Sequence, residues 1–171
     1  MSYRLPSRLP SRLPYRIGVI LAAAASAGAL TILPASAGAG GQEPGGPTVR
    51  FTAGGAACEA TPNNPHWSSG ASDRRILFKT RVTCTSTYPS VTVRIQGSLQ
   101  RGPFIGPKLV VATSDQTQVI KSGKSATFYT PLANGRQVST PGMYTGYIKG
   151  QITAPVPGNI DDGHSKTVEV K

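Results

Sequence analysis

Histidines and carboxylates, the residues best suited to acid–base or metal chemistry, are few and widely spaced in this sequence. The two histidines, His66 and His164, are far apart, and neither belongs to an H-E-x-x-H zinc motif. The chain lacks G-x-S-x-G, P-loop and G-x-G-x-x-G motifs, and its seven carboxylates are too scattered to nominate the pair that a glycosidase requires. We therefore expect no catalytic residue, no cofactor and no metal ion. The alternative is an enzyme or toxin whose site assembles from His66, His164 and nearby acids.

One segment, residues 159–164, concentrates oxygen ligands. It contains Asn159, Asp161, Asp162 and a glycine, whose oxygens suit a hard cation such as Ca²⁺. It lacks the Asp-x-Asp-x-Asp-Gly spacing and the distal Glu of a calcium loop. The same residue types are typical of a polar turn, and we favour that interpretation.

Two groups of side chains are candidates for binding a partner. Trp67, the only tryptophan, follows His66 in a polar segment, where an aromatic ring can stack on a sugar or anchor a protein. Alternatively, Trp67 closes one end of the fold. Four basic residues on predicted strands would form one patch if their strands are neighbours; otherwise they lie on different sheets and guard against edge-to-edge association. They are Lys79, Arg81, Arg94 and Lys149.

The first 37 residues have the three parts of a secretory signal peptide. Four arginines and no acid occupy residues 1–16, residues 17–33 carry no charge, and Ala35-Ser36-Ala37 is a small-residue cleavage site. A transmembrane anchor is the alternative, but the apolar run is short and rich in alanine. We expect a cleaved signal helix and a secreted, extracellular chain. Gly38 rather than cysteine would come first, which argues against a lipid anchor, and we expect no membrane span after it.

Export affects how the cysteines and the charge are interpreted. Cys58 and Cys84 are the only cysteines and lack C-x-x-C spacing, so an exported chain most simply pairs them as a disulfide. Closing a loop of about 27 residues would stabilise the fold by roughly 3.5 kcal/mol. Residues 38–171 contain fourteen basic and seven acidic residues. This excess indicates either a solvated surface or attraction to a polyanion, and its scattered positions do not form a nucleic-acid-binding motif.

Apolar and polar residues alternate with a period of two along much of the chain, which predicts β-strands. The clearest are residues 76–85, where only Leu77 breaks the alternation, and then 91–100 and 142–153. Weaker candidates are 49–52, 108–113, 118–121, 125–131 and 166–171. No segment after residue 37 has a helical pattern.

These elements predict an all-β fold with one domain, residues 48–171, after a flexible Gly-rich segment, residues 38–47. Seven or eight short antiparallel strands must bury one face each against a second sheet. We therefore expect a single immunoglobulin-like β-sandwich, with a closed barrel as the alternative.

The cleavage motif, the strand segment Val82-Thr83-Cys84-Thr85 and the strand opening Pro141-Gly142-x-Tyr144 resemble uncharacterised small secreted proteins of high-GC Gram-positive bacteria. This resemblance implies no particular activity. Tyr144 also matches the position of the tyrosine corner of Greek-key sandwiches, but a Tyr near the start of a strand is common and we favour simple packing. We expect a non-catalytic extracellular binding or interaction module, whose partner is an anionic cell-wall polymer or another extracellular protein.

Overall fold

The structure, a computed structural model, describes residues 45–69 and 74–171, which belong to the unit Gly38–Lys171. The predicted signal peptide, its cleavage residues Ala35 and Ala37, and residues 38–44 of the Gly-rich segment lie outside the described residues. Gly45, at the end of that segment, is buried and its amide donates a hydrogen bond to the carbonyl of Pro62. Among the described residues, no helix is long and apolar enough to cross a membrane.

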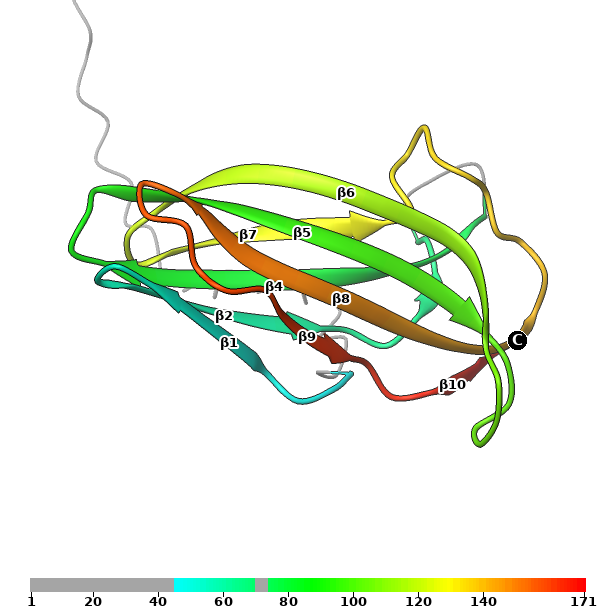
Figure 1. Cartoon of the computed structure of the whole chain (residues 1–171). Coiled ribbons are helices and arrows are strands. Elements are labelled where there is room, and N and C mark those ends of the chain that lie inside the picture. The colour runs from blue at the N-terminus through cyan, green and yellow to red at the C-terminus, as the bar shows by residue number, and fades with distance from the viewer. Residues whose placement is uncertain (1–44, 70–73) are drawn as a thin grey trace, which may run out of the picture. The chain divides into compact units, whose positions relative to one another are not determined.

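Ten β-strands in the described residues form two antiparallel sheets that pack face to face (Figure 1). The first sheet has the order β1-β2-β4-β7. The short β3 pairs with the first two residues of β4, and β2 pairs with the rest of that strand from Thr80 on. Its strands are β1 (Val49–Ala53), β2 (Ala56–Pro62), β3 (His66–Trp67), β4 (Ile76–Ser86) and β7 (Lys124–Thr130). The prediction of an all-β sandwich is confirmed, with more strands than the seven or eight expected.

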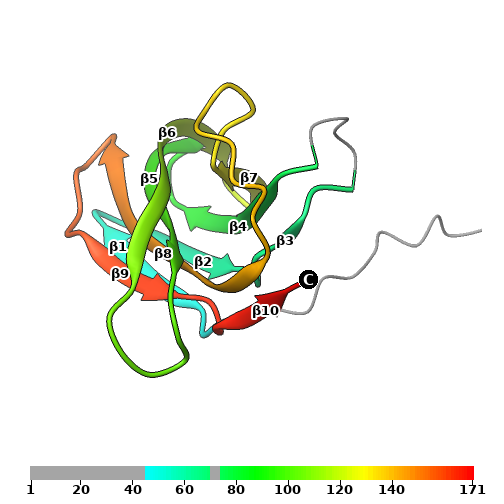
Figure 2. The same cartoon turned by 90° about the vertical axis from the view of Figure 1, so that its right-hand side faces the viewer.

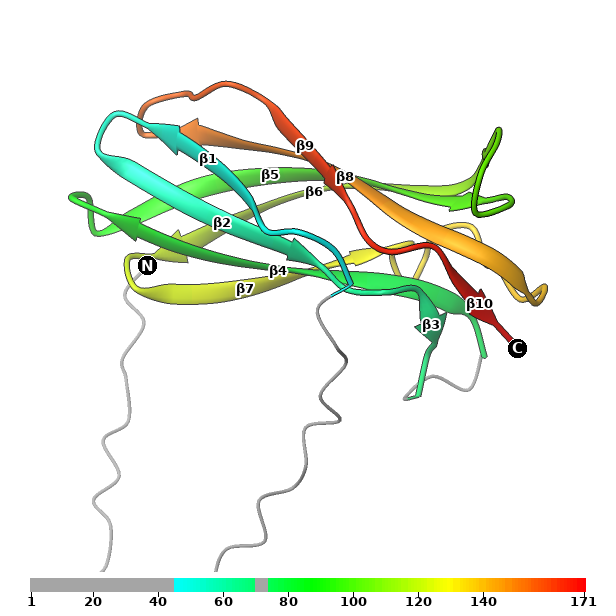
Figure 3. The ribbon, with the colours of Figure 1, turned by 90° about the horizontal axis from the view of Figure 1, so that it is seen from below.

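The second sheet has the order β10-β8-β5-β6, and β9 lies beside β8 on the same edge as β10 (Figure 3). Its strands are β5 (Ser90–Arg101), β6 (Leu109–Lys121), β8 (Gly142–Ala154), β9 (Asp161–His164) and β10 (Val168–Val170). Seen end-on, the two sheets face each other as two layers, and the core side chains pack between them (Figure 2). The chain passes between the sheets from β4 to β5, from β6 to β7 and from β7 to β8.

The core forms because each long strand turns its apolar residues to the same face. Phe78, Val82 and Cys84 of β4 are fully buried, as are Ile148 and Ile152 of β8. This is the alternation seen in the sequence. Glycines on the same face of β8 make room for aromatic rings, because a Cβ at Gly146 would lie 2.7 Å from the ring of Phe78.

The sandwich is closed along one side by side chains of β6. The amides of Gln116 and Gln118 donate hydrogen bonds to the carbonyls of Tyr129 and Thr127 on the outer edge of β7, at 2.7 and 3.0 Å. These bonds satisfy edge carbonyls that would otherwise offer a template for pairing with another chain. The polar middle of β6 therefore has a structural role.

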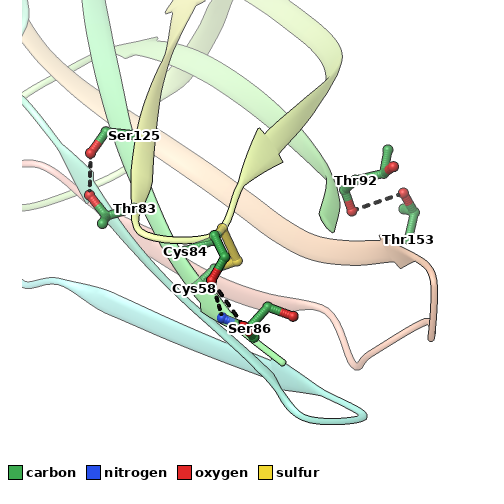
Figure 4. Close-up of a disulfide and its surroundings, with 8 residues drawn as sticks. Cys58, Thr83, Cys84, Ser86, Thr92, Ser125 and Thr153 are labelled. Carbon is green, nitrogen blue, oxygen red and sulfur yellow. Dashed lines mark hydrogen bonds between the residues drawn. A yellow bond between two sulfur atoms is a disulfide. The ribbon is translucent and has the colours of Figure 1, made fainter. Parts of the chain in front are cut away.

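The disulfide between Cys58 and Cys84 is present, with an S–S distance of 2.09 Å, so the predicted pairing is confirmed (Figure 4). The two residues are directly opposite each other on β2 and β4, and both are fully buried. The bond joins neighbouring strands of the first sheet and does not cross between the sheets.

Tyr144 lies at the start of β8 and is fully buried. Its hydroxyl donates a hydrogen bond to the carbonyl of Thr140, in the connection that leads into the strand. The side chain thus packs in the core and also holds the preceding connection against the sheet.

Candidate binding site

The strand register places His66, Leu77, Lys79 and Tyr129 on one surface, the outer face of the first sheet. His66 of β3 is opposite Leu77 of β4, and Lys79 of β4 is opposite Tyr129 of β7. Leu77 and Lys79 alternate with the buried Ile76 and Phe78, so their side chains point away from the core. Together with Ser68, Ser69 and Arg75 these residues line a hollow of about 310 Å³.

Leu77 is the apolar aliphatic residue in the described lining of this hollow. It is on the outer face of β4, yet only 3% of its surface is exposed. The chain therefore covers an apolar side chain on the solvent side of the sheet. This explains why Leu77 interrupts the alternation of the strand.

The described lining of the hollow includes two basic side chains, Lys79 and Arg75. Lys79 Nζ lies 5.9 Å from the centre of the Tyr129 ring, a distance at which the cation is attracted to the ring face. The buried Arg75 donates a hydrogen bond from its guanidinium to the carbonyl of Leu132 at 2.8 Å. None of the described residues that line the hollow is a carboxylate. An anion entering it would therefore meet cationic groups and no acid in the described lining.

His66 adds a titratable group to the hollow. Its Nδ1 donates to the carbonyl of Asn64 at 2.9 Å, which leaves Nε2 as an acceptor in the neutral ring. Burial lowers the pKa of His66 below its usual value of 6.5, the hydrogen bond to the Asn64 carbonyl opposes that shift, and the charge of Lys79 adds to it. The ring is thus neutral near pH 7 and gains a charge on acidification, most readily when an anion is bound.

Trp67 does not line the hollow. Its register partner is Ile76, on the inner face of the sheet, and its half-buried ring packs against the core. The indole Nε1 donates a hydrogen bond to the carbonyl of Lys171 beyond β10. The structure thus favours the interpretation in which Trp67 closes one end of the sandwich.

The four basic residues considered for one patch divide between the two sheets. Lys79 and Arg81 lie on the outer face of the first sheet, near the hollow. Arg94 and Lys149 lie on the outer face of the second. Arg94 donates two hydrogen bonds to Asp115, which lower the pKa of that carboxyl. Of these four residues, only Lys79 and Arg81 lie on the same sheet face as His66. Neither of these two cations has a carboxylate within ion-pair distance in the described part of the chain.

The other histidine lies elsewhere. Residues 161–164 form β9 rather than the polar turn we expected, so that prediction is wrong. Pairing with β8 draws this segment into the sheet, and the hydroxyl of Tyr147 donates to Asp162 at 2.7 Å. His164 is opposite Tyr147 on the outer face of the second sheet, so it cannot share a cleft with His66. Within residues 45–69 and 74–171, no three His, Cys, Asp or Glu side chains are grouped to hold a metal ion.

Sequence reasoning identified His66 and Lys79 but missed Tyr129, which strand pairing brings beside Lys79 from a distant part of the sequence. It also missed Arg75, which belongs to no motif. Leu77, as the exception in a regular strand, was the one local signal of the hollow. Comparisons with protein families and with curated proteins find no match for this chain.

Proposed function

We propose that this protein is a non-catalytic extracellular binding module that holds an anionic ligand in the hollow on the outer face of the first sheet. The observation that carries this proposal is the set of cationic and aromatic side chains around one depression of about 310 Å³, with no carboxylate in its described lining. Lys79 supplies a charge, His66 adds a second one when acidification protonates its ring, and Tyr129 supplies a ring face on which a sugar or polyol can pack.

The ligand class that fits best is an anionic cell-wall polymer, in which phosphate or carboxylate groups alternate with sugars or polyols. Arg81 lies two residues beyond Lys79 on the same face of β4, so a chain leaving the hollow would meet a second cation. The excess of basic over acidic residues after position 37 would also favour association with a polyanion. A secretory signal peptide in residues 1–37 would bring the domain to such a polymer.

We also propose that the sandwich is immunoglobulin-like. The strand order β9-β8-β5-β6 in one sheet, with β4 beside β7 in the other, supports this connectivity. The hydrogen bond from Tyr144 to Thr140 matches a tyrosine corner. The disulfide differs from that of antibody domains, which links the two sheets, because here it joins β2 to β4.

The proposal is tested with a soluble poly(glycerol phosphate) and a matched pair of charge reversals. Lys79→Glu removes a cation at the hollow, while Lys149→Glu makes the same change on a central strand of the other sheet. We expect Lys79→Glu to weaken binding about tenfold, which corresponds to about 1.4 kcal/mol for one charged contact. Lys149→Glu should stay within about twofold, and wild-type binding should weaken as salt screens the charges.

Equal effects of the two reversals would contradict the proposed site, since they would indicate only a response to net charge. Absence of binding to poly(glycerol phosphate) and to an acidic polysaccharide would contradict the proposed ligand class. Folding of each variant is checked by its urea midpoint.

A further inference from the structure

The hairpin that joins β5 to β6 presents apolar side chains to solvent. Phe104 is 71% exposed and Ile105 is 86% exposed, in consecutive positions at its tip. Leu109 at the start of β6 is 71% exposed as well. The hairpin stands away from the body of the sandwich in two views (Figures 1 and 2). Such a concentration of exposed apolar groups is unusual on a soluble domain and marks an interaction surface.

The base of the hairpin is held by a hydrogen bond to β8 and by contact between its two legs. The amide of Gly102 donates a hydrogen bond to the carbonyl of Met143 at 3.1 Å. A Cβ at Gly102 would lie 2.7 Å from the carbonyl oxygen of Pro107, so the two legs are in contact there. Pro103 and Pro107 also restrict the backbone on each side of the tip. The base of the hairpin is therefore fixed, which limits the entropy lost when the tip binds.

Basic residues lie on both legs behind the tip. Arg101 donates a hydrogen bond to the carbonyl of Pro141 at 3.1 Å, and Lys108 Nζ donates to the hydroxyls of Thr145 and Thr167 at 2.9 Å. The sequence between Gln96 and Asp115 contains no acid. Apolar groups in front and cations behind them match the layers of an anionic membrane surface, where hydrocarbon lies beneath negatively charged headgroups.

We propose that the tip formed by Phe104 and Ile105 inserts into the interface of an anionic lipid membrane, while Arg101 and Lys108 lie near the lipid phosphates. This surface belongs to the β5–β6 hairpin and shares no residue with the hollow of the first sheet. The charge pattern favours lipid over an apolar pocket on a protein, because both cations flank the tip and no acid interrupts the segment.

The test places a fluorescent probe at the tip of the full chain. Phe104→Trp is compared with Val119→Trp, a matched control at a position that is 68% exposed on β6, away from the tip. The emission of wild-type protein, which comes from Trp67, is subtracted. With vesicles containing phosphatidylglycerol, Phe104→Trp should show a blue shift and quenching by brominated acyl chains. Val119→Trp should show neither, and phosphatidylcholine vesicles should produce little change in either variant.

The readout is local to the tip, so other membrane contacts made by the chain do not produce it. The proposal is overturned if residue 104 stays in water with anionic vesicles, or responds equally to neutral ones. It is also overturned if a blue shift appears without vesicles and tracks self-association in sedimentation velocity, since a second copy would then cover the tip. Adding Lys79→Glu should leave the vesicle response intact, which separates this proposal from the binding of polymer at the hollow.

Discussion

At the scale of single residues, the packing of the core depends on Gly146. Its missing side chain leaves room for the ring of Phe78, and a Cβ there would lie 2.7 Å from ring carbons. Gly146→Ala should therefore destabilise the fold by about 1–3 kcal/mol, the usual effect of forcing extra volume into a packed core. The measurement is the free energy of unfolding in urea.

Steric conflict can be separated from a backbone effect by a second substitution. Phe78→Leu removes part of the ring that the new methyl group meets, so Gly146→Ala should be less harmful in that background. A double-mutant cycle measures this coupling. Strictly additive losses would show that the methyl group and the ring do not compete for the same space.

His66 should give protein stability and ligand affinity opposite pH dependences. Its pKa in the folded protein is below 6.5, mainly because of burial, and the charged and titratable groups that line the hollow with it are Arg75, which directly precedes β4, Lys79 of β4 and Tyr129 of β7. Just below pH 6.5, the unfolded chain takes up a proton that the folded chain does not. The free energy of unfolding should therefore fall as the pH drops through this window. An anion in the hollow favours the protonated ring, so binding should strengthen over the same window.

Both dependences are measured from about pH 8 to about pH 5, by urea midpoints and by polymer binding. His66→Asn removes the titrating ring and should flatten both curves. His164→Asn, on the other sheet, serves as the control and should leave the binding curve unchanged. If binding in wild type and His66→Asn varies equally with pH, another group is responsible.

At the scale of elements, the disulfide fastens β2 to the centre of the first sheet. Cys58 and Cys84 are 26 residues apart in sequence and fully buried in the core. Restricting the unfolded chain should contribute about 3.5 kcal/mol of stability. Unfolding of the wild-type chain in urea should therefore shift to lower concentration when reductant is present. The variant Cys58→Ala/Cys84→Ala, which has no bond to reduce, should be insensitive to reductant.

The long strands of the core were predictable because each turns one face to the core and the other to solvent. The ranges 76–85, 91–100 and 142–153 predicted β4, β5 and β8 almost to their ends. Strand β6 was predicted as two pieces, because Gln116 and its polar neighbours face solvent and the edge of β7. Strand β2 was missed, since its inward residues are small and its pattern is weak.

The binding site was less predictable than the fold. Its residues come from β3, β4, the segments beside them and β7, and Tyr129 of β7 joins the others only through long-range pairing. No local motif unites them. The outward faces of two sheets look alike in sequence. The alternation places Lys79 and Lys149 equally well on exposed strand positions, but only the sheet order shows that they lie on opposite layers. Physical adjacency, rather than residue type, decides which cations act together.

At the scale of the whole molecule, the hollow and the hairpin tip present two different chemistries from one rigid sandwich. The hollow is cationic and concave, whereas the tip is apolar and convex. The ligands that we propose for them, an anionic polymer and an anionic lipid membrane, are correspondingly different. Each proposal can fail without the other, because Lys79 lies on the first sheet and Phe104 lies in the loop that joins two strands of the second.

Both proposed ligands lie outside the cell, so both proposals depend on export of the chain. Export is tested by the cleavage of the predicted signal peptide. Cleavage after Ala37 should release a chain that begins at Gly38, and mass spectrometry of the protein in the culture medium measures this directly. Ala35→Leu/Ala37→Leu places bulky side chains where the peptidase accepts small ones, and should block cleavage. Ser36→Leu alters only the unconstrained middle position and should be processed normally. A secreted chain that starts elsewhere, or a chain retained in the cell without processing, would contradict the predicted leader and remove the route by which the domain reaches its proposed ligands.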